Sequence, residues 1–379
     1  MAQLKVLDIN NLYSPTGGGI RVYHNEKLKW CRRNNIKNLL LFPASSDIQL
    51  ENGVIQGIKS PKLGKSGYNF FVNGRLLREA ILEFDPDIVE LGSGIVVPAM
   101  VKKTIQNIPS FAYFHSNWTE TLPMSLFGVS NRKLTGLFQK LSNPLMRRAY
   151  RSLDSVFAGS EYSLSKLTAS GLSNLTKVPL GVDVNLFHPD KKSSMLRVSL
   201  GVESQQKMVL YMGRLAPEKG IHVFLDACKH LVKNKSIVIV IAGSGHYTKQ
   251  VKKMVQKYPK RMKFINKVHS REETAQLMAS ADIFVSAGPF ETFSLTTLES
   301  LCSGTPVAAC RQAAASELIL KARGESVYSP WNCPEALAAA IQSGIVASQT
   351  EINSYRNFAR LFTWDACFTK IFSTYKKFL

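Results

Sequence analysis

The sequence has 379 residues, which predicts two domains, and 45% of them are hydrophobic, as in ordinary globular proteins. Its six cysteines are scattered without a C-x-x-C pair, which argues against a zinc site or a disulfide framework, and no run of about 18 apolar residues predicts a membrane span. The net charge of +21 favours an anionic partner, whether nucleic acid, an anionic membrane surface or a phosphorylated substrate.

The chain begins with a predicted strand at residues 5–9, and a glycine turn follows it. The N-terminus is too short and too polar for a signal peptide and is predicted to form this strand. The scattered cysteines fit a reducing cytosol. Gly17, Gly18 and Gly19 stand between this strand and a predicted helix. Glycines at such a turn let backbone N–H groups approach a phosphate or a sugar. The turn does not match G-x-G-x-x-G, and a plain flexible turn explains it equally well.

Two segments of the first half combine cations with large apolar residues. Residues 59–78 are predicted to form an exposed loop, and residues 131–153 a helix with six cations and no acid. A basic amphipathic helix is typical of a protein that binds an anionic membrane surface. The alternative is a surface helix that packs its apolar face on its own core.

His115 ends a predicted strand at residues 109–115. Ligands of open α/β sheets bind at the carboxyl ends of strands, so His115 is placed to contact one. A lone histidine is more often structural, and that alternative stays open.

A polar stretch after residue 190 marks the domain boundary, and the second domain is predicted from 195 to 362. A strand at residues 208–215 carries Arg214, and Lys219 lies in the loop before the next helix. Two cations at this turn suit a diphosphate, because arginine binds it bidentately and lysine acts as a point charge. The alternative is a solvated ion pair with Glu218.

Residues 281–309 are predicted to form a strand, a loop, a helix and a second strand. Glu291 lies in the loop at the carboxyl end of the strand at 283–286, the ligand-binding edge of an open sheet. Glu299 lies about 40° from an apolar residue of the helix at 294–303, so a partner is required if it is buried. Free N–H groups at the start of that helix suit a phosphate. The alternative is a surface acid in the loop and a lysine-paired acid on the helix.

Strands and helices alternate in both halves, with candidate ligand groups at strand ends. We therefore predict an α/β fold of two doubly wound, Rossmann-like domains that face one another across a cleft. The N-terminal, acceptor-binding domain is predicted at residues 1–190 and the donor-binding domain at 195–362. A last helix at 363–379 is expected to pack back on the first domain.

The motifs GRLAPEKG, ETFSLTTLE and GTPV, in this order, resemble the nucleotide-sugar domain of retaining glycosyltransferases with the GT-B fold. The large group 1 (family 4) of nucleotide-sugar-dependent enzymes is most similar. The resemblance extends to SPTGGGIR, FHSNW, GSEYSLSKL and VPLGVDVNLFHP, so it covers nearly the whole chain. It implies transfer with retention of configuration and without a metal or other cofactor.

The resemblance implies roles for the acids and cations of the second domain. Arg214 and Lys219 would neutralise the donor diphosphate and the charge that grows on the leaving group. Glu291 would hold sugar hydroxyls, and Glu299 would accept both ribose hydroxyls. Phe293, Ser294 and Leu295 would offer backbone N–H groups to the sugar or the β-phosphate. Gly243 would be a further donor-binding residue.

The first domain would complete the site. By resemblance, Gly18 and Gly19 would reach the phosphate, and His115 would contact the donor sugar near its anomeric carbon. We thus predict a cytoplasmic glycosyltransferase, peripheral on the inner face of the membrane through 59–78 and 131–153. It would move a hexose from a UDP- or GDP-sugar to a lipid-linked or saccharide acceptor. Two alternatives are an epimerase of the same fold and, less favoured because the cations are dispersed, a nucleic-acid-binding protein.

Overall fold

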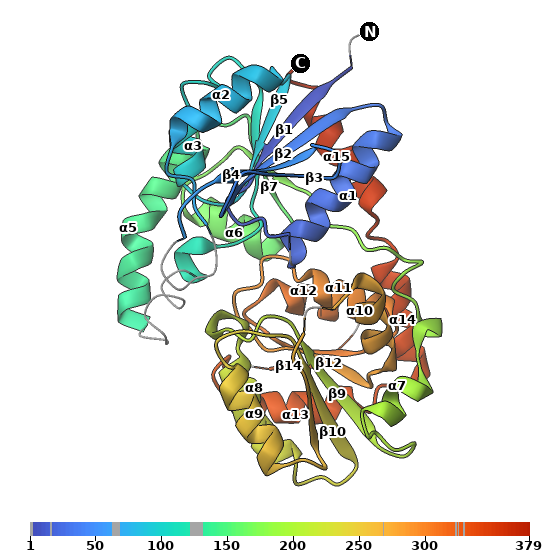
Figure 1. Ribbon diagram of the computed structural model, residues 1–379. Helices are drawn as coiled ribbons and strands as arrows, with labels where there is room; N and C mark the ends of the chain where they lie inside the picture. The colour runs from blue at the N-terminus through green and yellow to red at the C-terminus, as the bar shows by residue number, and fades with distance from the viewer. Residues whose placement is uncertain are drawn as a thin grey trace. The chain divides into compact units, whose positions relative to one another are not determined.

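The chain forms two compact units in a computed structural model (Figure 1). The first unit comprises Met1–Leu180 with Trp364–Leu379, and the second comprises Gly181–Thr363. The predicted boundary after residue 190 lies later than the observed one. The segment after Leu180 joins the second unit, where the Val182 N–H donates to the Phe362 carbonyl over 2.9 Å. The structure describes residues 3–15, 17–62, 69–121, 132–267, 269–322, 324, 326–328 and 330–379.

The first unit is built on an eight-stranded sheet in the order β3-β4-β2-β1-β5-β6-β7-β8, parallel except for β3. Its central strands are almost fully buried because helices cover both faces, as parallel sheets require. The strands are β1 Lys5–Ile9, β2 Lys37–Ala44, β3 Ile48–Leu50, β4 Ile55–Lys59, β5 Ile88–Leu91, β6 Ser110–Tyr113, β7 Ser155–Ala158 and β8 Leu175–Lys177.

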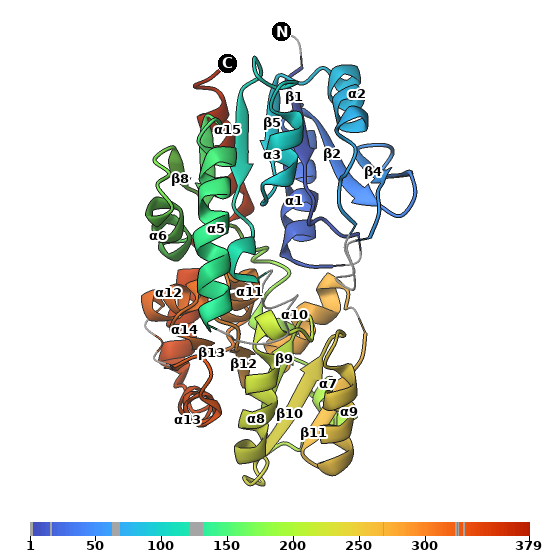
Figure 2. The ribbon, with the colours of Figure 1, turned by 90° about the vertical axis from the view of Figure 1, so that its left-hand side faces the viewer.

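The helices of the first unit form two layers on this sheet (Figures 1 and 2). Helices α2, α3, α5 and α6 share an apolar core with one face of the sheet, and α1 and α15 pack on the other face. Their bounds are α1 Gly19–Arg33, α2 Gly74–Phe84, α3 Val96–Val101, α5 Arg132–Tyr150, α6 Glu161–Ala169 and α15 Trp364–Tyr375.

The segment 59–78 is not simply an exposed loop as predicted. Phe71 is only 2% exposed and belongs to the core, and α2 already begins at Gly74. The prediction of an exposed loop was based on the cations of the segment. Burial of the aromatic side chain beside the start of the helix stabilises the fold more than leaving it exposed would. Residues 63–68, including Tyr68, lie outside the described part of the chain.

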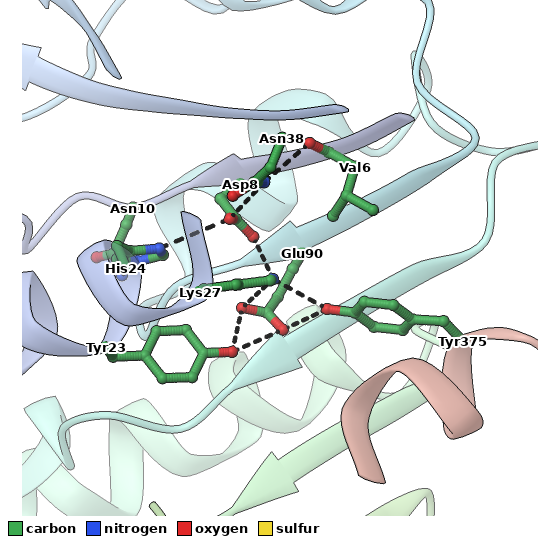
Figure 3. A network of polar contacts seen from close by, with 9 residues as sticks. All are labelled: Val6, Asp8, Asn10, Tyr23, His24, Lys27, Asn38, Glu90 and Tyr375. Carbon is green, nitrogen blue, oxygen red and sulfur yellow. Dashed lines mark hydrogen bonds and ion pairs between the residues drawn. The ribbon is translucent and has the colours of Figure 1, made fainter. Parts of the chain in front are cut away.

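A fully buried polar network joins the two central strands of the first unit to α1 and α15 (Figure 3). The Lys27 ammonium lies 2.7 Å from Asp8 Oδ1 and 3.1 Å from Glu90 Oε1, and its side chain has no exposed surface. Tyr23 donates to Glu90 over 2.8 Å, and the Tyr375 hydroxyl also donates to Glu90. The network fixes the C-terminal helix on the first unit, because buried charges are tolerated only with paired partners.

The second unit contains a six-stranded sheet, parallel throughout its described pairs, in the order β11-β10-β9-β12-β13-β14. The first strand of this unit, β9, therefore lies between β10 and β12, and the strand order reverses there. The strands are β9 Lys207–Met212, β10 Ile237–Ala242, β11 Met262–Ile265, β12 Ile283–Ser286, β13 Val307–Cys310 and β14 Val327–Tyr328.

Eight α-helices accompany this sheet in the described part of the second unit, with short 3-10 turns before α7 and α8. The helices are α7 Ser194–Ser199, α8 Ile221–Leu231, α9 Thr248–Lys257, α10 Arg271–Ser280, α11 Leu295–Cys302, α12 Ala314–Lys321, α13 Pro334–Gly344 and α14 Gln349–Ala359, and the second 3-10 turn is Pro217–Lys219. The predicted strand at 283–286 is confirmed as β12, and the helix predicted at 294–303 as α11. Within the described residues, no helix is long and apolar enough to cross a membrane.

Candidate active site

The loops after β9 and β12 meet at the point where the strand order of the second sheet reverses. Open α/β sheets bind ligands at the carboxyl ends of such strands. Gly220 has φ +68°, and a Cβ there would lie 2.5 Å from the Ala287 carbonyl oxygen. The two loops therefore touch through their backbones, and only glycine fits at this contact. The geometry brings Arg214, Lys219 and Glu291 to one edge of the second unit.

Lys219 and Glu291 form an ion pair across these loops. The Lys219 Nζ donates to Glu291 Oε1 over 2.7 Å, and the two side chains are 36% and 20% exposed. Lys219 ends the 3-10 turn that precedes α8, which carries its ammonium toward the loop after β12. The pair thus joins a cation and a carboxylate on an edge that water, and hence a ligand, can reach.

Arg214 makes the ion pair that the alternative interpretation predicted, with Glu218. Its Nη2 lies 3.1 Å from Glu218 Oε1, and the arginine side chain is 46% exposed whereas Glu218 is buried. The buried carboxylate holds the guanidinium at the mouth of the loop. An ion pair of this kind leaves hydrogen-bonding capacity for an anion, because one guanidinium presents five N–H donors.

Ser294 adopts a left-handed backbone conformation, with φ +67° and ψ 69°, immediately before α11. A non-glycine residue in this region carries about 1–3 kcal/mol of strain, which persists where the surroundings impose it. Its neighbours Phe293 and Leu295 are buried and anchor the turn on both sides. The first N–H groups of a helix have no carbonyl partner one turn earlier, so the start of α11, close in sequence to Glu291, offers backbone donors.

Glu299 is buried on α11. A buried carboxylate requires a partner, and here the partner is Arg271, whose guanidinium donates a hydrogen bond to it. Arg271 is the first residue of α10, and its guanidinium lies 4.7 Å from the centre of the Phe187 ring. Burial raises the pKa of Glu299, and the Arg271 charge opposes that rise. Sequence reasoning missed Arg271, because no local motif connects it with an acid 28 residues further along the chain.

Gly243 lies at the same edge, directly after β10. Its φ is +136°, and a Cβ at this position would lie 1.9 Å from the Gly213 carbonyl oxygen. No side chain fits there without a shift of the backbone. Gly243 therefore allows the loops after β9 and β10 to pack against each other next to Arg214.

Three predicted residues, Gly18, Gly19 and His115, belong to the first unit. Gly18 precedes α1 with φ +90° and open space around it, and Gly19 is the first residue of that helix. The His115 ring stacks on Tyr113, with centroids 4.4 Å apart, and lies 4.7 Å from the ring of Tyr23.

The surroundings of His115 keep its ring uncharged. Burial away from water is the main reason that the pKa of His115 lies well below its usual value, and the nearby charges of His24 and Lys27 lower it further. A neutral imidazole at pH 7 can exchange hydrogen bonds with hydroxyl groups without carrying charge. Tyr23, which packs on His115, is itself held by Glu90 in the buried network (Figure 3).

A metal site has no obvious ligands in the described part of the chain. Those residues contain no group of three or more His, Cys, Asp or Glu side chains placed to hold an ion. The acids and cations at the edge of the second unit are instead arranged in pairs, which suits an anionic or hydroxyl-rich ligand.

Two family models match the chain. "Glycosyltransferase Family 4" matches residues 17–186 and "Glycosyl transferases group 1" matches residues 194–358. Together they cover most of both units.

Similar proteins include curated mannosyltransferases. The chain is 26% identical, over 98% of its length and 96% of the relative's, to a GDP-mannose-dependent alpha-(1-6)-phosphatidylinositol dimannoside mannosyltransferase of Mycobacterium tuberculosis. It is 27% identical to a GDP-mannose-dependent alpha-mannosyltransferase of Corynebacterium glutamicum, over 69% of this chain and 59% of the relative.

Solved structures share the architecture. Sucrose-phosphate synthase from Thermosynechococcus elongatus superposes with a TM-score of 0.79 over 99% of both chains at 16% identity. Anabaena HepE, in complex with UDP and glucose, gives a TM-score of 0.73 at 19% identity, over 99% of this chain and 100% of that one. The predicted GT-B fold, with two Rossmann-like domains, is confirmed.

Proposed function

Because this chain belongs to the group 1 glycosyltransferases, we propose that it transfers a hexose from a nucleotide-diphosphate sugar to a lipid-linked or saccharide acceptor. The observation that carries the proposal is the Lys219–Glu291 pair beside Arg214 at the edge of the second sheet. The names of the similar mannosyltransferases make GDP-mannose the first donor to test and a glycolipid the first acceptor. Retention of configuration and independence of metal follow from the family resemblance.

In this proposal the donor diphosphate binds Arg214 and Lys219. Phosphate oxygens compete well with the carboxylates that now pair with these cations, because charged hydrogen bonds to arginine and lysine are strong. As the bond from the sugar to the β-phosphate breaks, negative charge grows on the diphosphate, and two preorganised cations stabilise it. Once Lys219 contacts phosphate, Glu291 is available to accept hydrogen bonds from sugar hydroxyls.

The nucleoside half of the donor is assigned to Glu299. In this proposal the buried carboxylate, beside the guanidinium of Arg271, accepts hydrogen bonds from two ribose hydroxyls, each worth about 1.5–3 kcal/mol. The backbone N–H groups around Phe293, Ser294 and Leu295 would bind the β-phosphate or sugar, and Gly243 would leave room for the donor.

Gly18, Gly19 and His115 are proposed to supply the contacts of the first unit. The open space around Gly18 leaves its backbone accessible to a phosphate. The neutral imidazole of His115 can hydrogen-bond to the donor sugar without adding charge near the anomeric carbon.

The experiment that tests this proposal measures nucleotide release from a panel of donors. The purified protein, with EDTA present, is incubated with GDP-mannose, UDP-glucose, UDP-galactose and UDP-N-acetylglucosamine, with and without phosphatidylinositol mannoside. We expect selective release of GDP from GDP-mannose, increased by the acceptor and abolished in Glu291→Gln. Release that requires added Mg²⁺ would overturn the metal-independent reaction. Failure of all four donors, together with no thermal stabilisation by GDP or UDP, would overturn the transferase assignment.

A further inference from the structure

Helix α5 carries a row of exposed leucines on its outward face. Leu137, Leu141 and Leu145 are 55%, 66% and 52% exposed, and they recur every four residues. On a helix this spacing places them on one side, and the core-facing side is formed by other residues such as Met146 and Tyr150, which are buried. We call Leu137, Leu141 and Leu145 the leucine ridge. Contiguous exposed apolar side chains of this kind indicate an interaction surface.

Cations lie beside the leucine ridge. At about 100° per residue, the three leucines span an arc of about 80°. Lys140, Arg147 and Arg151 fall within an arc of about 40° that begins about 40° from the edge of the ridge. Arg148 falls within the arc of the ridge itself. All four cations are exposed, and α5 contains no acidic residue.

The same cations line a hollow between α5 and the end of α6. Its lining contains no acid and consists of Lys140, Asn143, Pro144, Arg147, Arg148, Arg151, Ala169 and Ser170. The Arg147 side chain lies close to Gly171, since a Cβ added there would be 3.2 Å from the arginine Cδ and Nη1. The hollow therefore presents a group of positive charges next to an apolar ridge.

We propose that this face of α5 docks on a bilayer that contains anionic phospholipid. The leucine ridge would enter the boundary between headgroups and acyl chains, and phosphates of the headgroups would occupy the basic hollow. The charge pattern selects this occupant, because apolar residues beside cations without acids complement a surface that is apolar inside and anionic outside. The proposal does not depend on the identity of the donor or on the transfer reaction.

Other occupants fit this surface less well. A second copy of this chain would bring a group of four cations against a similarly basic protein, because the net charge is +21. Nucleic acid would bind the cations but would leave the leucine ridge exposed. Helix α2 is no equivalent surface: it has exposed Leu82, but Arg75 pairs with Glu79 over 2.8 Å, and acids balance its cations.

The test is co-sedimentation of the full chain with vesicles of phosphatidylcholine alone or mixed with phosphatidylglycerol. We expect binding only to the anionic vesicles. Arg148→Gln/Arg151→Gln should weaken it about 25-fold, since each cation near an anionic surface contributes about a factor of five. The triple substitution of the leucine ridge to serine should weaken it more than tenfold, and the remaining binding should be lost at high salt.

Matched controls carry the same chemical change elsewhere. Lys252→Gln/Lys253→Gln removes two cations from α9, a basic helix without exposed leucines, and Leu82→Ser removes an exposed leucine from α2. Both should bind vesicles as the wild type does, and all variants should keep wild-type melting temperatures and donor hydrolysis. The proposal would be overturned if the α9 and α5 variants lost binding equally, or if the ridge variant bound as the wild type does. It would also be overturned if binding were insensitive to salt, or if the protein self-associated in place of binding vesicles. Absence of binding of the wild type to anionic vesicles would overturn it too.

Discussion

Two lysine–carboxylate pairs share an N–O distance of 2.7 Å but differ in burial and in their place in the fold. In the first unit Lys27 pairs with Asp8 and has no exposed surface, whereas in the second unit Lys219 pairs with Glu291 and is 36% exposed. The buried pair belongs to a closed network with Glu90 and two tyrosines (Figure 3). The exposed pair lies at the ligand-binding edge of its sheet. Distance alone therefore does not separate a structural ion pair from a functional one; burial and place in the fold do.

The largest effect is expected from Lys27→Met. The substitution leaves Asp8 and Glu90 buried without a counter-charge, which should lower the free energy of unfolding by about 3–5 kcal/mol. Urea unfolding measures it. Lys29→Met is the control, because Lys29 lies on the same helix but its side chain is 64% exposed, so little change is expected. Equal stability of the two variants would remove the structural half of the comparison.

The exposed pair should show the opposite behaviour. Lys219→Met should lower the rate of sugar transfer by about 10²–10³, since a charge that stabilises the leaving group is lost. Its free energy of unfolding should change by less than about 1 kcal/mol. Lys229→Met, which removes an exposed ion pair with Asp226 on α8, should leave transfer unchanged. A Lys219→Met protein that is fully active, or inactive only because it unfolds, would contradict the assignment.

Glu299 and Arg271 lie between these extremes, since the carboxylate is buried and its partner is partly exposed. Glu299→Gln should raise the donor Kd by about 10- to 100-fold, because hydrogen bonds to a charged acceptor are weakened. Arg271→Met should raise the pKa of Glu299 further, since burial already raises it and the opposing charge is gone. As the pH is lowered and Glu299 becomes protonated, donor affinity, measured by calorimetry, should then begin to decrease at a higher pH in the variant than in the wild type. Identical pH profiles would show that Arg271 does not control this carboxylate.

The smallest effect is the dependence of stability on acid. Burial by itself raises the pKa of Asp8, but Lys27 and His24 lower it from 3.8 to about 2. A lowered pKa in the folded state stabilises the protein above pH 4, and that contribution, about 2 kcal/mol, disappears as the pH falls from about 4 to 2. Chemical unfolding at several pH values should show a shallower decline in Asp8→Asn over this window. A decline as steep as in the wild type would exclude Asp8 as its source.

The sequence was sufficient for the features that depend on local pattern. The apolar run at 283–286 predicted β12, because parallel strands are buried on both faces. Glycine after a strand and cations before a helix indicated the loops that carry Gly18, Arg214 and Lys219. The wider architecture followed because alternation of strands and helices leaves few ways to bury both.

What the sequence could not show depends on contacts between distant residues. No local pattern around Lys27 predicts its burial. It is buried because Glu90 and Tyr375, 63 and 348 residues away in the chain, meet it in space. Arg271 was missed for the same reason. Phe71 was assigned to an exposed loop because its neighbours are charged, and only the fold reveals the core beside it.

The central claim is that Arg214 and Lys219 hold the diphosphate of the donor. Calorimetric titration of the wild type and of Lys219→Met with GDP and GMP, and with UDP and UMP, tests it most directly. We predict that the wild type binds the diphosphate of its own base at least about tenfold more tightly than the monophosphate, since one further charged contact is worth about 1.5–3 kcal/mol. That preference should disappear in Lys219→Met. Equal affinity for both nucleotides in the wild type, or an unchanged preference in the variant, would contradict the account.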